Sequence, residues 1–225
     1  MPLDPRPRFA RVIKRTLDIA GSLALGVISA PALVLACAAI RIESSGSPIY
    51  RQRRVGKQGA QFDLFKLRTM VSGAETMGAG LAVDEDDRRI TRIGGILRRF
   101  SLDELPNLIN VLRGDMSLVG PRPTVATQVA QYTERQWQRL AVEPGITGWA
   151  QVKGRAALPW HERIELDLWY IEHWSLRLDL RILASTARLL ASGKGLYRGT
   201  TGGWRPPADV GTGEAPERGR PGVER

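Results

Sequence analysis

Two adjacent carboxylates, Asp103 and Glu104, are the residues in this sequence best suited to chemistry on a phosphate. They stand where a helix is expected to begin, because Pro106 is tolerated only in the first turn of a helix. Backbone N–H groups without partners lower the free energy of holding anions at such a point. A purely structural interpretation also fits: Ser101 and Glu104 match a capping box, and Asp103 matches an N-cap.

Arginines in turn-rich segments favour the chemical interpretation. Their guanidinium groups offer two-pronged hydrogen bonds to phosphate oxygens. A carboxylate, a divalent metal ion and arginines are the minimum set for phosphoryl transfer through an aspartyl-phosphate type of intermediate. The arginines of this set are Arg68, Arg98, Arg99, Arg113, Arg122 and Arg155.

An uncharged run from Ile19 to Ile40 predicts a membrane helix. Its 22 residues would extend about 33 Å, close to the thickness of the hydrocarbon core of a bilayer. Pro31 interrupts the run, and basic clusters flank it on both sides, which disfavours placing one flank outside the cell. We therefore expect a helix that bends at Pro31 and returns, with Ser29 near the kink, over a plain spanning helix. A cleaved secretory signal fits least, because the run is too long.

Charge and composition narrow the class of partner. The 225 residues carry 33 Lys+Arg against 23 Asp+Glu, and residues 1–57 alone hold ten basic and three acidic side chains. Such an excess suits phosphate ligands, anionic lipid headgroups or nucleic acid. The single cysteine, Cys37, excludes an intrachain disulfide framework.

The remaining segments predict a mostly helical α+β fold. Residues 49–70 read as short strands broken near Gly56, and helical spacing of apolar residues covers 90–112, 124–142, 161–174 and 179–192. We expect a basic N-terminus and re-entrant, Pro-kinked membrane helix at 1–42, and a small cytosolic catalytic domain at 43–198. A Gly/Pro-rich tail at 199–225 is predicted to be disordered.

Several long strings, in order, resemble the bacterial sugar transferases, the monotopic polyprenyl-phosphate phosphoglycosyltransferases. The longest is SLDELPNLINVLRGDMSLVGPRP, residues 101–123. Further matches are Lys14-Arg15 with Asp18, and the strings at 51–56, 65–70, 144–152, 154–155 and 167–170. The resemblance extends to about Tyr197. It departs at the kink, where Ala30 rather than serine precedes Pro31, and beside Arg155, which Lys153-Gly154 and Ala156 flank.

The resemblance implies a ping-pong transfer at the cytoplasmic face of the bacterial cytoplasmic (inner) membrane. Asp103 would attack the β-phosphorus of a UDP-sugar, release UMP and pass the sugar phosphate to polyprenol (undecaprenyl) phosphate. Such an enzyme initiates lipid-linked glycan or exopolysaccharide synthesis. Mg²⁺ is expected at Asp103, with Glu104 as the partner carboxylate. Arg155 is expected to hold a substrate phosphate, and Arg68 and Arg122, which lie in matching strings, are assigned to the same task.

Three other functions remain open at the level of sequence. A peripheral membrane module would use the basic residues for anionic lipid and Asp103-Glu104 only as a cap. A related transferase with another donor would share the phosphate machinery. A nucleic-acid binder is disfavoured, so no nucleic-acid partner is expected, because aromatic residues are sparse (6%) and the basic cluster flanks an apolar run.

Overall fold

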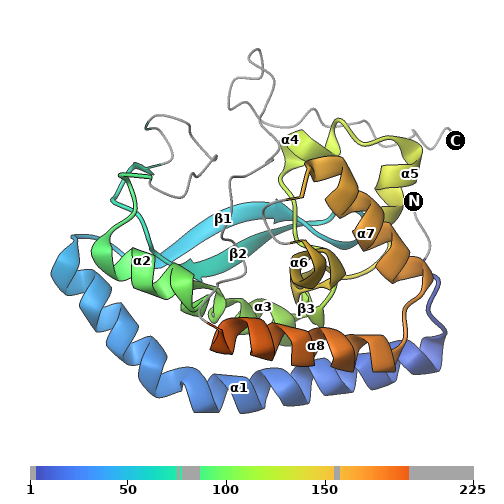
Figure 1. Ribbon diagram of the computed structural model, residues 1–225, viewed down its shortest axis with the longest axis horizontal. Helices are drawn as coiled ribbons and strands as arrows, with labels where there is room; N and C mark the ends of the chain where they lie inside the picture. The colour runs from blue at the N-terminus through green and yellow to red at the C-terminus, as the bar shows by residue number, and fades with distance from the viewer. Residues whose placement is uncertain (1–3, 75–76, 78–86, 155–157, 193–225) are drawn as a thin grey trace, which may run out of the picture.

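The computed structural model describes residues 4–74, 77, 87–154 and 158–192. A helix of 36 residues, α1 (Arg8–Glu43), runs along one edge of the molecule, and the other elements lie on one side of it (Figure 1). The predicted 199–225 tail and Arg155 lie outside the described residues. The predicted boundary at residue 42 falls at the end of α1.

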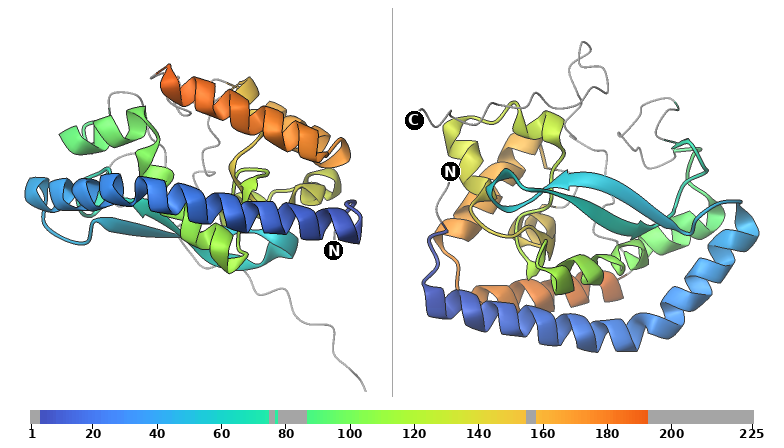
Figure 2. Two further views of the ribbon diagram at one scale, coloured as in Figure 1. Left: turned by 90° about the horizontal axis from the view of Figure 1, so that it is seen from below. Right: turned by 180° about the vertical axis from the view of Figure 1, so that it is seen from behind.

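The apolar run is one continuous helix that contains Pro31, and Figures 1 and 2 show α1 changing direction once along its length. Pro31 has no N–H to donate to the carbonyl oxygen of Val27. The hydroxyl of Ser29 donates to the neighbouring carbonyl oxygen of Gly26 at 3.4 Å. Ser29 therefore bonds a backbone carbonyl one residue before the one that Pro31 leaves without a donor.

The middle of α1 has no protein cover. Leu23, Val27, Ile28, Val34 and Leu35 are each more than half exposed, whereas water-soluble helices bury their apolar side chains. Among the described residues, α1 is the one helix long and apolar enough to cross a bilayer. These properties associate the chain with a membrane.

The predicted strands form an antiparallel hairpin, β1 (Ile49–Val55) with β2 (Gln61–Leu67), joined by the short 3₁₀ helix η1 (Lys57–Gly59). Ile49 pairs with Leu67, and Val55 pairs with Gln61. A second pair, β3 (Ser117–Val119) with β4 (Gly145–Thr147), is parallel and was not predicted, because three residues are too few to show an alternation.

Short helices fill the rest of the fold. They are α2 (Arg92–Arg99), η3 (Leu102–Glu104), α3 (Asn107–Arg113), α4 (Ala126–Val129), α5 (Glu134–Trp137), η4 (Gln138–Leu140), α6 (Trp149–Lys153), α7 (Trp160–Glu172) and α8 (Leu176–Ala191).

The two C-terminal helices confirm the predictions at 161–174 and 179–192. The single helix predicted at 124–142 is wrong, since α4, α5 and η4 share that segment. Thr133 and Gln136 form a capping box that starts α5 afresh, and a capping box marks a helix start rather than a helix interior.

The core lies between the hairpin, α3, the β3–β4 pair and the last two helices. Phe62, Val111, Val119, Tyr170 and Ile182 are buried together there. A separate cluster joins Ile40, near the C-terminal end of α1, to Leu67 of β2 and Leu97 of α2. The long apolar helix α1 is therefore packed into the same body as the rest of the fold.

Helix α2 approaches the chain after β2 so closely that only glycine fits at position 94. A Cβ atom built on Gly94 would lie 2.0 Å from the carbonyl oxygen of Thr69, whereas one on Gly95 would meet nothing within 4 Å. The Thr69 oxygen also accepts a hydrogen bond from Thr91 N. This contact fixes the distance between α2 and the chain that follows the hairpin.

Gly94→Ala is expected to lower the free energy of unfolding by more than about 2 kcal/mol, because backbone atoms must move apart. Gly95→Ala is the matched control, and it is expected to add about 0.5–1 kcal/mol through helix propensity alone. Chemical denaturation of the two variants in detergent measures both. Equal effects would show that α2 does not rest on Thr69.

Candidate active site

The carboxylate pair lies in η3, a 3₁₀ turn, and not at the start of an α-helix. The helix itself, α3, begins at Asn107 after Pro106, so the expected helix start was placed about four residues too early. Ser101 before the turn has φ +54°, a conformation that non-glycine residues adopt rarely and mostly at functional sites. Asp103 and Glu104 are both buried, at 7% and 3% exposure.

The capping interpretation of this segment is wrong. The Ser101 hydroxyl is buried and caps nothing. The Ser101 N–H donates to the carbonyl oxygen of Arg98 at 3.2 Å, so the Glu104 side chain does not receive it. Capping the start of a helix therefore does not explain why the carboxylates are buried.

Glu104 is held between two cations. Its Oε1 accepts from Lys66 Nζ at 2.6 Å and from an Arg122 Nη at 3.2 Å. Burial by itself would raise the pKa of Glu104, but Lys66 and Arg122 lower it below its ordinary value. Glu104 is consequently ionised and committed to this pairing.

Asp103, by contrast, presents an uncommitted oxygen. Its Oδ1 is buried and has no hydrogen-bond partner in the part of the chain that the structure describes. The pKa of Asp103 is raised to about 6, mainly by burial and also by the charge of Glu104. The cations Lys66, Arg98 and Arg122 oppose this rise. A buried acceptor without a donor is unfavourable for folding unless something else occupies it.

Lys66 is the residue that sequence reasoning missed. It lies in β2 on the same face as Phe62 and Leu64, both buried, so the alternation of the strand places it inward. Burial lowers the pKa of Lys66, while the charge of Glu104 opposes that shift. A lysine at the third inward position of an apolar strand face was the available signal.

The predicted phosphate-binding arginines do not all lie together. Arg122 lies at the carboxylate pair, where it pairs with Glu104, and its contact with a substrate phosphate stays a prediction. Arg68 instead donates to the carbonyl oxygens of Ser44 and Ser45, at 2.7 and 2.6 Å, in the loop after α1. The structure thus gives Arg68 a role in holding that loop and does not bring it to Asp103. Arg98, from the wider arginine set, contributes to the electrostatics of Asp103 and donates to Thr69 Oγ1 at 2.8 Å.

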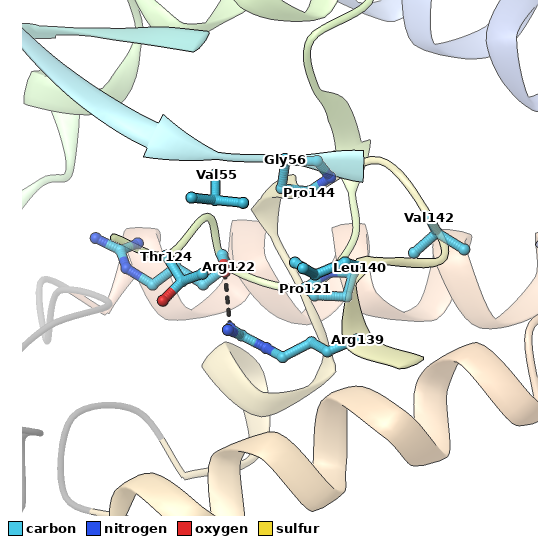
Figure 3. Close-up of a pocket in the computed structure, with 9 residues that line it drawn as sticks. All are labelled: Val55, Gly56, Pro121, Arg122, Thr124, Arg139, Leu140, Val142 and Pro144. Atoms are coloured by element: carbon cyan, nitrogen blue, oxygen red, sulfur yellow. Dashed lines mark hydrogen bonds between the residues drawn. The ribbon is translucent and has the colours of Figure 1, made fainter. Parts of the chain in front are cut away.

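A buried network fixes the backbone of Arg122. Arg139 donates to the Arg122 carbonyl oxygen at 2.7 Å, to Asp167 at 2.7 Å and to the Tyr132 hydroxyl at 2.6 Å. Figure 3 shows Arg139 reaching this carbonyl while the Arg122 side chain extends away from it. The cavity drawn there measures about 10 Å³, room for about one water. The hydrogen bonds of Arg139 therefore anchor the Pro-Arg-Pro turn, and the cavity beside them is too small for a substrate.

The carboxylate pair fits a divalent cation only together with substrate. The described residues contain no group of three Asp, Glu, His or Cys side chains arranged around one point. Mg²⁺ in phosphoryl-transfer sites is commonly bound by one or two carboxylates plus substrate phosphates and water. Asp103 would supply one such ligand through its other carboxylate oxygen, which leaves the unpartnered Oδ1 unengaged.

Comparison with known proteins identifies the family. The model of the family described as bacterial sugar transferase matches residues 9–193, most of the chain and all of the elements just described. The chain belongs to the bacterial sugar transferase family. It is therefore an enzyme, and the resemblance seen in the motifs is confirmed.

Individual relatives are similar to this chain over most of its length, and the names of two of them specify substrates. The chain is 40% identical to the uncharacterized sugar transferase EpsL of Bacillus subtilis (strain 168), over 83% of this chain and 91% of that protein. It is 42% identical to the UDP-glucose:undecaprenyl-phosphate glucose-1-phosphate transferase of Caulobacter vibrioides, over 87% of this chain and 76% of the relative. It is 36% identical to the undecaprenyl-phosphate galactose phosphotransferase of Salmonella typhimurium, over 84% of this chain and 43% of the relative. The chain thus spans less than half of that longer relative.

Asp103→Asn in this sugar transferase is expected to stabilise the fold at neutral pH in EDTA. Because the pKa of Asp103 is raised in the folded state, folding favours the protonated form. The stability this confers is complete below about pH 4 and is lost as pH rises through about 6. At pH 7.5 the ionised carboxylate should cost on the order of 2–3 kcal/mol, from about 1.4 kcal/mol per pKa unit.

Denaturation curves from pH 4 to pH 8 measure this effect, with Asp63→Asn, a partly exposed carboxylate of β2, as the control. The advantage of Asp103→Asn should grow with pH, and Asp63→Asn should change stability by no more than about 0.5 kcal/mol at neutral pH. An Asp103→Asn protein less stable than wild type at pH 7.5 would contradict the assigned environment.

Proposed function

We propose that this enzyme transfers a sugar-1-phosphate from a UDP-sugar to undecaprenyl phosphate and so initiates polysaccharide synthesis. Three relatives support the substrate class, since their names specify undecaprenyl phosphate with glucose, galactose or N-acetylgalactosamine as the transferred sugar. The variation in sugar among relatives of similar identity leaves the donor's hexose open, while the phosphate chemistry is common to all.

The contrast between the two carboxylates carries the mechanism. A nucleophile needs an oxygen lone pair that is not already engaged, and it must be positioned without a competing donor. Oε1 of Glu104 is engaged by Lys66 and Arg122, whereas Oδ1 of Asp103 has no partner among the described residues. Asp103 is therefore the nucleophile, and Glu104 holds the two cations in place.

Two displacements complete the reaction. First, an Asp103 oxygen forms a bond to the β-phosphorus of the UDP-sugar, and the bond from that phosphorus to the bridging oxygen breaks, so UMP leaves with the electron pair. Second, an oxygen of undecaprenyl phosphate bonds to the same phosphorus and the aspartyl oxygen leaves as a carboxylate. The products are undecaprenyl-diphosphate-sugar and regenerated enzyme.

The cations around the pair neutralise the donor. A bare carboxylate repels a diphosphate, and positive groups preorganised in a buried site remove that barrier. Lys66, Arg98 and Arg122 supply such charge near Asp103, and Arg155, from the family motif, is proposed to add a further phosphate contact. Mg²⁺ bound through Asp103 would supply additional charge neutralisation when the donor is present.

Both ends of α1 are attached to the same catalytic body, which supports a re-entrant membrane helix. Near its start, Lys14 Nζ lies 2.8 Å from Asp179 of α8. At its end, Glu43 accepts from the backbone N–H of Arg92 at 2.8 Å. A 36-residue helix is about 54 Å long, far more than the roughly 30 Å of a bilayer core. If α1 spanned the bilayer, one of its two attachment points would lie on the opposite side of the membrane from the catalytic domain.

We therefore place the bend near Pro31 inside the bilayer, with both basic flanks and the catalytic domain at the cytoplasmic face of the bacterial inner membrane. This arrangement brings a water-soluble donor and a lipid-linked acceptor to one interfacial site, which is what the reaction requires.

Without acceptor, wild-type enzyme in detergent with Mg²⁺ and its UDP-sugar should release about one UMP per active site and retain the sugar phosphate covalently. Asp103→Asn should release none, while the control Asp63→Asn should match wild type. A panel of UDP-glucose, UDP-galactose and UDP-N-acetylgalactosamine identifies the donor. A lipid-binding module would give no UMP in any reaction, and a burst in Asp103→Asn would refute the assignment.

Cysteines placed at Arg8 and Ser45, both exposed at the two ends of α1, should be equally protected from an impermeant thiol reagent added to intact cells. Cys37 is changed to Ala in this background. Both sites should react after the inner membrane is permeabilised. Labelling of only one of them in intact cells would establish a spanning helix instead.

A further inference from the structure

A second basic site lies at the start of α1, away from the carboxylate pair. It is a cavity of about 150 Å³ between α1 and the chain around Gly114, just after α3. Helix α3 is seven residues long, or about 10 Å, and it separates this cavity from η3. Lys66, Arg98 and Arg122, the cations that lower the pKa of Asp103, do not line this cavity.

Four cationic side chains and two carboxylates line this cavity. These are Arg6, Arg11, Lys14 and Arg15, with Asp18 and Glu143. Within this set, two of the cations already have acidic partners: Arg6 pairs with Asp4 and Glu143, and Lys14 pairs with Asp179 and Asp18. The other two cations, Arg11 and Arg15, form no salt bridge with a carboxylate of the described residues.

Arg15 and Arg11 differ from the paired cations. Arg15 donates once from each terminal nitrogen, to the carbonyl oxygens of Val111 and Leu112 at the end of α3, which leaves its charge uncancelled and further N–H groups for a ligand. Nε of Arg11 is buried, and the structure shows no hydrogen-bond partner for it within the described ranges. Buried donors are almost always satisfied by protein, water or an ion, so this one marks a ligand position. An anion is the ligand that a guanidinium binds best.

The surroundings identify which anion. On α1, Arg11, Lys14, Arg15 and Asp18 follow helical spacing on one face, and the exposed apolar residues Phe9, Val12, Ile13 and Leu17 follow it on the other. A helix with such an exposed apolar face lies at the membrane interface, with that face about 5–10 Å into the boundary. The polar face packs against the protein, where Lys14 and Asp18 are buried. The cavity is therefore at the level of lipid phosphates.

We propose that this cavity binds the phosphate of an anionic phospholipid, with Arg11 and Arg15 as its cationic ligands, and that the bound lipid anchors the start of α1. The volume suits the ligand, since a cavity of this size holds a benzene-sized molecule and hence a phosphate group with its ester oxygens. The inference rests on the interfacial placement of α1 in the proposed function but requires no turnover.

The test uses the full-length protein in detergent, with phosphatidylglycerol as the probe and native mass spectrometry to measure bound lipid and its apparent Kd. Wild type should bind one phosphatidylglycerol tightly. Arg11→Gln should weaken this binding about tenfold or more, since it removes charge-assisted hydrogen bonds. Arg8→Gln is the matched control, because Arg8 is an exposed arginine of the same helix outside the cavity, and it should change the Kd less than about twofold.

Each alternative gives a distinct result. Equal weakening in Arg8→Gln and Arg11→Gln would indicate general attraction and overturn the proposal. Competition by millimolar inorganic phosphate as effective as the lipid would indicate a soluble anion, and equal binding of phosphatidylcholine would remove the requirement for an anionic lipid. Arg11→Lys, which keeps the charge and loses the planar fork, should bind with intermediate affinity and guards against misfolding of the glutamine variant. UMP release with added acceptor is measured separately. A protein that releases UMP but does not bind the lipid overturns the lipid site alone and leaves the proposed reaction in place.

Discussion

The burial of two neighbouring carboxylates in one 3₁₀ turn is the constraint on which the site depends. Two adjacent buried negative charges repel each other and are poorly solvated, so the fold must supply positive charge or leave one of them protonated. It does both. Lys66 and Arg122 compensate Glu104, and the pKa of Asp103 rises to about 6. The asymmetry gives one carboxylate a structural task and leaves the other with an open oxygen in a cationic environment.

The rest of the structure serves this arrangement. β2 presents Lys66, α2 presents Arg98, and the Pro-Arg-Pro turn presents Arg122 from a backbone that Arg139 clamps. The close approach of α2 to Thr69 and the attachment of α1 at both ends bring these elements to the membrane surface as one body. Membership of the bacterial sugar transferase family accounts for this combination of a phosphate-handling site and an apolar helix.

Much of this organisation was predictable from sequence, for identifiable reasons. The apolar run, the hairpin at 49–70 and the last two helices have strong periodicity or clear breaks, and local patterns of that kind persist in the fold. A long motif predicted Asp103, Glu104 and Arg122 as members of one site, and the structure pairs Arg122 with Glu104. The parallel β3–β4 pair and the partners of Lys66 and Arg139 were not predicted, because they join residues far apart in the chain whose types are individually ordinary. Arg68 shows the opposite failure: an arginine in a matching string lies instead against the loop after α1. Arg155 and the tail after residue 198 lie outside the described residues, so those predictions stand as made.

Reductive trapping tests the assignment of the nucleophile most directly. Borohydride reduces an acyl phosphate to an alcohol, so a phosphorylated aspartate becomes homoserine and a phosphorylated glutamate becomes hydroxynorvaline. Enzyme loaded with donor in the absence of acceptor, reduced and digested, is predicted to yield a peptide with homoserine at position 103 and unchanged Glu104. Hydroxynorvaline at position 104, or a peptide unmodified at both positions despite UMP release, would contradict the account.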